Sequence, residues 1–414
     1  MIFRMRVLIC GLNFAPEVTG TGKYTTELAE YLVEQGNPVR IISAPPYYPH
    51  WKKPDKYKGV RYQTEYWNGI EVIRCPIYVP KNPTGLKRII HLGSFGFSSS
   101  LELLNQFQWK PDIVFSVAPT LFNAPAVYRY SRRVRAVSWL HIQDFELEAA
   151  SGLAMLPGKR LIYPLAKKYE EYSIGRFDIC STISKRMIES LKQKNVPAHK
   201  TFYFPNWVDT GLIYPLDGAS PLRAELGIPE EKIVVLYAGN MGNKQDLDLV
   251  IDAAKLLENI KGLFFVLSGE GPLKEWLIKK SRGVQNILFA PLQPVKKLNH
   301  LLNIADIHVL PQRPGTADAV LPSKLTGMLA SGKPVIATAL PETEITSELS
   351  GTIRIIAPGD PQALADEIRN LYYNPHSRQQ YGSLGRAFAQ KHWSKEEILK
   401  GVLVKFQQLI KNES

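Results

Sequence analysis

The sequence predicts an α/β protein made of two doubly wound domains, each with a parallel sheet covered by helices. Short apolar runs with a strand pattern alternate with longer runs of helical periodicity, and this alternation is typical of parallel sheets with right-handed crossovers. The chain has 414 residues. That length is too great for one hydrophobic core and fits two domains of about 200 residues each.

The first half begins with a strand. An apolar run over residues 6–11 is followed by a loop rich in Pro and Gly, and then by a helical pattern that includes Leu28, Ala29, Leu32 and Val33. The alternation continues, with further strands expected at 39–43, 72–74, 113–116, 136–140, 179–182 and 201–204 and helices near 94–107, 121–133, 158–173 and 184–194. This half therefore predicts one complete doubly wound sheet.

The alternation restarts after Pro205-Asn206, which marks the domain boundary. Strands are expected at 233–237, 263–267, 287–289, 307–310, 335–338 and 352–356. A last helical stretch over 395–410 is long enough to pack back across the first domain. We therefore expect an N-terminal domain at 1–205, a C-terminal domain at 206–390, and a C-terminal helix at 391–414 that packs on the N-terminal domain.

The positive charge is concentrated in the first half. The chain carries a net charge of +13, of which residues 1–205 contribute +12 and residues 206–414 contribute +1. A basic face of this kind suits nucleic acid, an anionic membrane surface or a phosphorylated substrate, although the basic clusters also fit ordinary solvated surfaces. The sequence has no zinc-ligand spacing, aromatic RNA-binding motif or basic heptad region, so nucleic acid is the disfavoured partner.

The sequence also bears on the compartment. No run reaches the roughly 18 apolar residues that a bilayer-spanning helix needs, and the first residues lead directly into a strand pattern rather than a signal peptide. We therefore expect a cytoplasmic protein. Cys10, Cys75 and Cys180 lie far apart, within or beside apolar runs, which predicts buried, reduced thiols rather than a disulfide framework or a metal cluster.

Four glycine-punctuated segments of the second half predict a ligand site. They cover residues 237–244, 268–272, 321–325 and 330–335, and each lies where an apolar run ends and a helical pattern begins. In an open parallel sheet that place is the carboxyl edge, where ligands bind. The candidate contacts for a ligand there are Asn240, Gly242, Lys244, Glu270, Ser323, Lys324 and Leu325.

The loop after the first strand is a second candidate. Its segment Gly20-Thr21-Gly22 lacks the upstream glycine of a P-loop and the third glycine of the dinucleotide fingerprint, so a P-loop or NAD site is disfavoured. The segment still opens a helix, where free N–H groups can approach a phosphate or a sugar closely. The alternative is that these glycines only make the turn.

Taken in order, the motifs resemble the family 4 glycosyltransferases of the GT-B fold, and the resemblance covers nearly the whole chain. Within that family the segment around Arg313 and Lys324 is most similar to colanic-acid-type exopolysaccharide glycosyltransferases. The motifs that carry the resemblance are Gly20-Thr-Gly22, His141-Ile-Gln-Asp144-Phe-Glu146, Pro205-Asn206-Trp-Val-Asp209, Gly239-Asn240-Met-Gly242, Ser268-Gly-Glu270-Gly-Pro272, and Pro322-Ser-Lys324-Leu followed by Gly332-Lys-Pro-Val335.

The resemblance implies a reaction and its substrates. A sugar would move from a UDP- or GDP-sugar to an acceptor hydroxyl with retention of configuration, without a metal or other cofactor. The N-terminal domain would bind the acceptor and the C-terminal domain the donor. A polyprenyl-diphosphate-linked or other glycan would be the acceptor, in exopolysaccharide or cell-surface polysaccharide synthesis.

The resemblance also implies catalytic roles. The departing diphosphate develops negative charge, so Lys244, Lys324 and the N–H groups near Ser323 and Leu325 would stabilise it. Gly20, Thr21, Gly22, Asn240 and Gly242 would contribute to donor binding. His141 would contact the donor sugar or its phosphate, while Asp144 and Glu146 would orient the acceptor hydroxyl or accept its proton. A histidine at a strand end is, however, often structural.

Two positions depart from the family pattern. The wider family carries two glutamates where this chain has Ala319 and Gly327. Asp318 could supply the first sugar contact, and Glu270 could contact the base or the ribose. Two alternatives stay open. One is a sugar-nucleotide epimerase or hydrolase, and the other, suggested by these departures, is a sugar-nucleotide-binding protein without catalysis.

A segment of the first half has the composition of a membrane-surface element. Residues 81–110 combine Lys81, Lys87 and Arg88 with a series of Ile, Leu and Phe side chains. Several basic residues near anionic lipid can give reversible association, at about 1 kcal/mol each. We therefore expect peripheral contact with the inner face of the membrane, with a core helix as the alternative.

Overall fold

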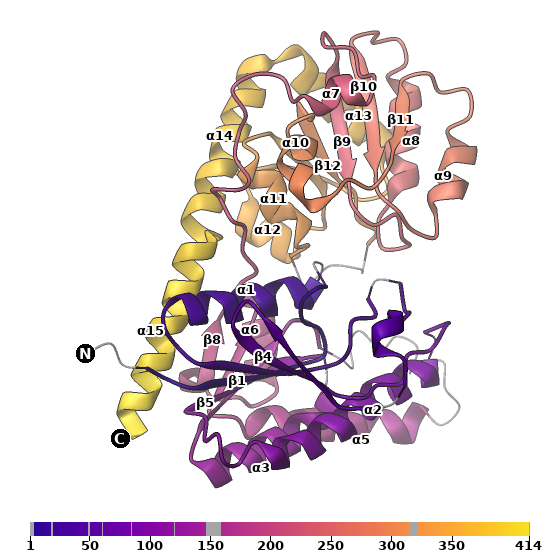
Figure 1. The fold of residues 1–414 in the computed structure, drawn as a ribbon. Helices are drawn as coiled ribbons and strands as arrows, with labels where there is room; N and C mark the ends of the chain where they lie inside the picture. Colours follow the sequence, from indigo (N-terminus) through magenta and orange to yellow (C-terminus); the bar gives the residue numbers. More distant parts are fainter. Residues whose placement is uncertain are drawn as a thin grey trace. The chain divides into compact units, whose positions relative to one another are not determined.

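The computed structural model describes residues 4–17, 20–48, 50–59, 61–83, 85–119, 121–145, 159–314 and 321–413. The chain forms two compact units, one made of Met1–Pro205 with Leu399–Ser414 and the other of Asn206–Ile398 (Figure 1). We call them the N-terminal unit and the C-terminal unit. Each contains a largely or wholly parallel sheet with helices, so the predicted fold class is confirmed.

The sheet of the N-terminal unit has eight strands in the order β3-β4-β2-β1-β5-β6-β7-β8. All neighbouring pairs are parallel except β3 and β4. Every residue of β1, β5 and β6 is buried, as expected for central strands covered on both faces. The strands are β1 (Val7–Gly11), β2 (Val39–Ser43), β3 (Gln63–Trp67), β4 (Ile70–Arg74), β5 (Ile113–Ala118), β6 (Val137–Ile142), β7 (Ile179–Thr182) and β8 (Thr201–Tyr203).

Helices cover both faces of this sheet. Helices α2, α3 and α5 lie side by side on one face (Figure 1), and α3 contacts the other two. The described helices are α1 (Gly20–Glu34), α2 (Gly85–Asn105), α3 (Ala124–Val134), α5 (Lys159–Gly175) and α6 (Lys185–Gln193), with short 3-10 turns η1 (Asp55–Tyr57), η2 (Leu121–Asn123) and η4 (Ala198–Lys200).

The last helix, α15 (Lys395–Glu413), ends on the N-terminal unit. Its Phe406 is fully buried and packs edge-on against Trp139 and Phe115, with ring centroids 5.0 and 5.9 Å apart. Because Trp139 and Phe115 belong to the central strands β6 and β5, this contact makes the end of α15 part of the N-terminal core.

The C-terminal unit has a six-stranded, fully parallel sheet in the order β11-β10-β9-β12-β13-β14. Its strands are β9 (Ile233–Ala238), β10 (Leu263–Ser268), β11 (Ile287–Ala290), β12 (Ile307–Leu310), β13 (Val335–Thr338) and β14 (Arg354–Ile356). Its helices are α7 (Leu222–Glu225), α8 (Leu247–Leu256), α9 (Lys274–Lys280), η5 (Val295–Lys297), α10 (Leu298–Leu302), α11 (Lys324–Ala330), α12 (Glu344–Leu349), α13 (Pro361–Tyr373) and α14 (Pro375–His392).

The strand predictions succeed where the sequence has buried apolar runs. Strands β2, β7, β12 and β13 begin and end at the predicted residues, whereas β3 was not predicted. Strand β3 is an antiparallel edge strand whose residues are all at least partly exposed, so it has no continuous apolar run. Helix α2 begins nine residues before the predicted start.

Two further observations concern the cysteines and the membrane. Cys10, Cys75 and Cys180 are buried free thiols, as predicted. Within the described ranges, no helix combines the length and the apolar character needed to cross a bilayer.

Candidate functional site

The glycine-rich loops of the C-terminal unit meet at the carboxyl end of its sheet. The loop after β9 and the loop after β10 are joined by main-chain hydrogen bonds from Met241 N to Glu270 O (2.8 Å) and from Leu273 N to Met241 O (3.0 Å). A Cβ atom at Gly269, which has φ of 152°, would lie 1.9 Å from Gly239 O. Glycine is therefore needed here so that the two loops can pack backbone against backbone.

Lys324 lies at the centre of this edge. Its Nζ donates a hydrogen bond to the hydroxyl of Tyr237 (3.0 Å) and lies 4.4 Å from the centre of that ring. The Tyr237 hydroxyl in turn donates to the carbonyl oxygen of Asn240 (2.5 Å). Burial lowers the pKa of Lys324 to about 7. No acidic side chain among the described residues pairs with Lys324.

The neighbouring predicted residues are more exposed. Asn240 and Lys244 are exposed, and Gly242 is buried. The Lys244 carbonyl accepts a hydrogen bond from Arg313 N (3.2 Å). The Glu270 side chain is 58% exposed and pairs with Lys274 (2.6 Å), so a ligand hydroxyl would compete with this lysine for the carboxylate.

The start of α11 holds the next group of predicted residues. Ser323 is exposed and immediately precedes the helix, and its side chain accepts no capping hydrogen bond. The Leu325 amide donates to Pro322 O (2.9 Å), and the Leu325 side chain is fully buried. Because this N–H is already bonded within the chain, Leu325 must be removed from the free amides that we expected.

The two departures from the family pattern fall in different places. At Gly327, a Cβ atom would lie 3.3 Å from Leu302 Cδ1, so a larger side chain there would require this leucine to shift. Asp318, Ala319 and Glu146 lie outside the described residues.

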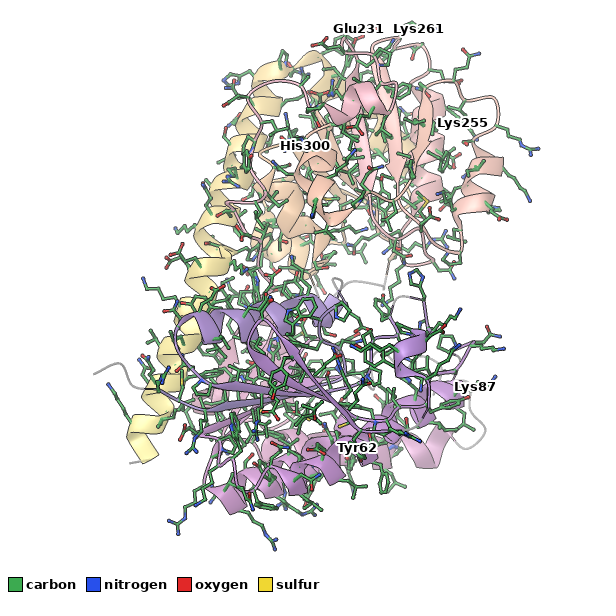
Figure 2. All side chains as sticks on the ribbon, in the orientation of Figure 1. Tyr62, Lys87, Glu231, Lys255, Lys261 and His300 are labelled. Carbon is green, nitrogen blue, oxygen red and sulfur yellow. The ribbon has the colours of Figure 1, made fainter. Side chains whose placement is uncertain are left out.

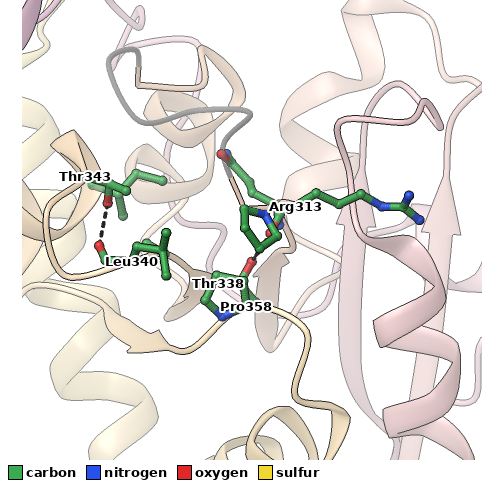
Figure 3. Close-up of a pocket in the computed structure, with 9 residues that line it drawn as sticks. Arg313, Thr338, Leu340, Thr343 and Pro358 are labelled. Carbon is green, nitrogen blue, oxygen red and sulfur yellow. Dashed lines mark hydrogen bonds between the residues drawn. The ribbon is translucent and has the colours of Figure 1, made fainter.

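Arg313 links two strand ends of this unit. A hollow of about 10 Å³, enough for about one water molecule, lies where β12 and β13 end (Figure 3). The Thr338 hydroxyl closes it by accepting from Gln312 N (2.6 Å) and donating to Gln312 O (2.9 Å). Arg313 points away from the hollow and pairs with Asp246 (3.3 Å) and Asp248 (2.9 Å).

The two aspartates differ in their ionisation. Burial raises the pKa of Asp246, and the nearby Asp248 charge adds to this effect. For Asp248, burial acts to raise the pKa, but the hydrogen bonds and the charge around it, with the bond from Arg313 foremost, together lower it. Arg313 therefore holds the loop after β12 against the start of α8.

In the N-terminal unit, the predicted glycine loop begins α1. Thr21 donates its hydroxyl to Asn13 Oδ1 (3.2 Å), and Asn13 Nδ2 donates to Glu17 Oε2 (2.7 Å). A Cβ atom at Gly22 would lie 3.0 Å from Glu17 O, whereas Gly20 has φ of 59° and open space around it. The glycines therefore serve the turn, and Gly20 also leaves open space at the start of α1.

His141 is enclosed within the unit. It is 4% exposed, its Nδ1 lies 2.9 Å from Ser181 Oγ, and its Nε2 lies 2.9 Å from Gln143 Nε2. The ring packs on Phe115 and Phe204, with centroids 5.8 and 4.7 Å away. Burial lowers the pKa of His141 to about 3, so the ring is neutral.

Asp144 has a different environment. It follows the end of β6 and is partly exposed, whereas His141 and Gln143 before it are buried. Since both ring nitrogens of His141 have partners inside the unit, the geometry favours the structural alternative for this histidine. Asp144 is the better placed of the two to meet a substrate.

The structure brings some predicted residues together and separates others. Asn240, Glu270 and Lys324 converge through the contacts above. Strand β5 lies between β1 and β6, so the glycine loop and His141 are on separate strand ends. Tyr237 was not among the predicted site residues, although an aromatic residue near a strand end, two residues before Gly239, could have indicated it.

Comparison with family models matches both units. Residues 19–207 match the model described as glycosyl transferase 4-like domain, and residues 220–388 match the model described as glycosyl transferases group 1. The chain is also 40% identical over 406 residues to WcaI of Escherichia coli (strain K12), which is named as a colanic acid biosynthesis glycosyl transferase. That alignment covers 96% of this chain and 98% of WcaI.

Solved structures show the same fold. Sucrose-phosphate synthase from Thermosynechococcus elongatus superposes with a TM-score of 0.74 at 17% identity, covering 99% of this chain and 100% of that one. HepE of Anabaena, solved in complex with UDP-glucose, superposes with a TM-score of 0.69 at 13% identity, covering 98% of this chain and 100% of that one.

Proposed function

Because this chain belongs to the family 4 (group 1) glycosyltransferases, a retaining family with the GT-B fold, we propose that it transfers a hexosyl or deoxyhexosyl unit from a nucleotide-diphosphate sugar to a glycan acceptor. The similarity to WcaI supports a place in exopolysaccharide or cell-surface polysaccharide assembly. The HepE structure, which contains UDP-glucose, supports a UDP-sugar as one of the first donors to test.

The observation that carries this proposal is Lys324, whose ammonium pairs with no acidic side chain among the described residues. A departing diphosphate gains negative charge in the transition state, and a fixed cation in a site of low dielectric stabilises that charge. Lys324 is held by Tyr237, which fixes where the ammonium lies. A bound diphosphate would supply the anion that the described residues do not.

Other groups of the same edge would complete the donor site. We propose that the amides of Ser323 and Lys324 and the exposed side chain of Lys244 contact the phosphates, with Asn240, Gly242 and Glu270 near the nucleoside or the sugar. Asp318 is retained as a proposed sugar contact. Because lysine ammonium groups supply the positive charge, we propose that the transfer needs no metal ion.

In the N-terminal unit we propose that Asp144 orients the acceptor hydroxyl, together with Glu146. His141 would then act as a positioning residue, because its buried ring supports the end of β6, three residues before Asp144. Gly20, with open space around it, remains a proposed donor contact together with Thr21 and Gly22.

A thermal-shift panel tests the donor proposal. UDP, GDP, ADP and their common sugar conjugates are added to the wild type, to Lys324→Ala and to Lys333→Ala as a matched lysine control. A ligand at about 100 times its dissociation constant should stabilise the fold by roughly 2.7 kcal/mol. We expect one nucleotide to stabilise the wild type and Lys333→Ala but not Lys324→Ala.

No stabilisation of the wild type by any nucleotide would contradict the donor proposal. Turnover separates the related activities, because an epimerase or hydrolase would convert the nucleotide sugar without an acceptor. Binding without any turnover, even with a cell-envelope glycolipid extract as the acceptor source, would contradict transfer. Activity that is unchanged by a chelator would support the metal-independent reaction.

The surface of α2 supports contact with a membrane. Its residues at spacings of three, four and seven form one exposed apolar stripe, and Phe97 is 70% exposed. Lys87 and Arg88 are exposed at the start of the same helix, and Figure 2 shows Lys87 on the N-terminal unit. We call this surface the α2 stripe; its apolar members are Leu86, Ile90, Phe97, Leu101 and Leu104.

Other contacts hold α2 in place beneath this stripe. Tyr62, also labelled in Figure 2, donates its hydroxyl to Ser98 O (3.0 Å). Phe95 and Leu103 are buried on the opposite side of the helix. The helix is therefore both a core helix and a candidate surface element, and we propose that the stripe binds an anionic lipid surface reversibly.

Vesicle flotation tests the membrane proposal. We expect the wild type to float with phosphatidylglycerol vesicles at low salt and less with phosphatidylcholine vesicles. The double variant Phe97→Ser with Leu101→Ser should lose most of the binding. Leu212→Ser, which changes a 68% exposed leucine of the C-terminal unit, is the matched control and should float like the wild type. Equal flotation of both variants would contradict a role for the stripe.

A further inference from the structure

The N-terminal unit contains a cavity beside the loop that begins α1. Its volume is about 160 Å³, and it lies at the carboxyl ends of β1, β2 and β5, between the start of α1 and the first turns of α2. An engineered cavity of about 150 Å³ binds benzene, so this space suits one six-membered ring rather than a nucleotide. Its lining consists of Leu12, Asn13, Gly20, Thr21, Tyr47, Tyr48, Trp51, Arg88, His91, Leu92 and Pro119.

Three aromatic rings of this lining form one cluster. The centroids of Tyr47 and His91 are 4.7 Å apart, those of Trp51 and His91 are 5.1 Å apart, and those of Tyr47 and Trp51 are 5.4 Å apart. Binding sites combine aromatic walls with a small number of placed polar groups. Such walls suit the apolar C–H face of a sugar ring, whereas its hydroxyls need polar partners.

His91 provides a polar partner of defined type. Its Nδ1 lies 2.6 Å from the carbonyl oxygen of Tyr78. A carbonyl oxygen can only accept, so Nδ1 carries the hydrogen. Burial lowers the pKa of His91, and the Arg88 charge acts in the same direction, which favours the neutral ring. Nε2 is therefore a hydrogen-bond acceptor.

This acceptor is not satisfied within the chain. His91 is 1% exposed, and Nε2 has no hydrogen-bond partner among the described residues. A buried polar atom without a partner costs about 1–3 kcal/mol. A ligand hydroxyl that donates to Nε2 would recover this energy.

Trp51 is the least buried ring of this cluster. The rings of Tyr47 and Trp51 pack against His91, and its Nε2 is buried from water. Trp51 is half-buried, and its φ of 50° is an unfavourable backbone conformation for an aromatic residue. A shift of the Trp51 ring onto a bound sugar would expose Nε2 to a ligand hydroxyl.

Glu17 holds the wall of the cavity in place. Its Oε1 accepts from the amides of Tyr47 and Tyr48 (both 2.7 Å), and its Oε2 accepts from Asn13 (2.7 Å). The carboxylate is buried and fully engaged, so it anchors the loop after β2 to the loop after β1. Glu17 therefore fixes one wall of the cavity.

We propose that this cavity holds the sugar ring of the acceptor, with Tyr47 and Trp51 against its face, His91 Nε2 accepting one of its hydroxyls, and Arg88 contacting an adjoining phosphate. This inference rests on the proposed transferase function, because only a transferase needs an acceptor sugar. Arg88 is exposed and is the charged side chain of the lining, which places a cation where the sugar would join a phosphate carrier.

Saturation-transfer NMR with methyl pyranosides tests the cavity. The probes are the methyl glycosides of galactose, glucose, mannose and fucose, with UDP and GDP present in excess so that the donor site is blocked. We expect saturation transfer to at least one sugar, loss of the signal in Trp51→Ala, and a smaller loss in Trp51→Phe. In His91→Asn, whose amide can still reach the Tyr78 carbonyl but lacks the Nε2 acceptor, the affinity should fall by about three- to tenfold.

Tyr66→Ala is the matched control, because Tyr66 is 76% exposed on β3 and does not line the cavity. Its sugar binding should equal that of the wild type. A glycosyl 1-phosphate should bind more tightly than the methyl glycoside of the same sugar, and Arg88→Gln should remove this preference whereas Lys87→Gln should retain it. Thermal unfolding of each variant shows whether it is folded.

Two results would overturn the inference. One is the absence of saturation transfer to every sugar, and the other is a signal that survives Trp51→Ala. Both are separate from the donor proposal, which depends on nucleotide binding at Lys324. If sugar binding depends on Trp51 but no nucleotide binds, the transferase proposal is contradicted. If a nucleotide binds but no sugar does, only the proposal for the cavity is contradicted.

Discussion

The affinity for the nucleotide sugar should fall as the pH rises from 6 to 8. Burial places the pKa of Lys324 at about 7 in the free protein. A bound diphosphate stabilises the ammonium and raises this pKa, so the complex retains a proton that the free protein has lost. Binding is therefore strongest below pH 7 and weakens above it.

The size of the effect follows from linkage. With a pKa of about 7 in the free protein and an ammonium that stays protonated across this range in the complex, affinity at pH 8 should be about tenfold lower than at pH 6, and binding at pH 7 should take up about half a proton. Titration calorimetry in two buffers of different ionisation enthalpy measures both quantities. A nucleotide sugar is the correct ligand because its diphosphate is esterified at both ends and does not titrate in this range.

Two lysine variants complete the experiment. Lys324→Met should bind weakly and without this pH dependence. Lys333→Met should keep the dependence, because Lys333 also has a burial-lowered pKa but lies at the opposite, amino end of β13. An affinity that is constant between pH 6 and 8 in the wild type, or a dependence that persists in Lys324→Met, would refute the reasoning.

Five further variants test other parts of the structure. Tyr237→Phe removes the hydroxyl that holds Lys324, so calorimetry should show donor affinity lowered by about three- to tenfold. In Gly269→Ala the added methyl group meets the Gly239 carbonyl, so denaturant titrations should show the free energy of unfolding lowered by more than about 2 kcal/mol. Gly93→Ala is the control, because its methyl group has open space on α2, and it should change this free energy by less than about 1 kcal/mol. His141→Ala should lower the melting temperature. Asp144→Asn should leave it unchanged but reduce transfer on the order of 100-fold; the reverse pattern would restore a direct role for His141.

The sequence predicts the sheet well wherever strands are buried on both faces. The runs at β2 and β12 consist mainly of β-branched or other apolar residues, and their limits agree with the prediction. Strand β3 differs because its partner β4 covers only one edge and its residues remain partly exposed. The energy that forms β3 comes from pairing, which leaves little apolar pattern in the sequence.

The candidate site is less predictable because it depends on hydrogen-bond partners that are distant in the chain. His141 receives its partner from β7, 40 residues later. Lys324 meets Tyr237 across 87 residues. Sequence spacing identifies the strand ends that carry these side chains, but it does not show whether a polar group is satisfied by the chain or left for a ligand.

This distinction separates the residues that we propose to bind from those that we propose to support. Glu17 and His141 have reactive groups, yet each is fully bonded inside the N-terminal unit. Lys324 lacks an anion and His91 Nε2 lacks a donor among the described residues. We propose that a ligand supplies the complementary group for each, a phosphate for Lys324 and a hydroxyl for His91. These are the two functional groups that a transferase must bind, one on its donor and one on its acceptor.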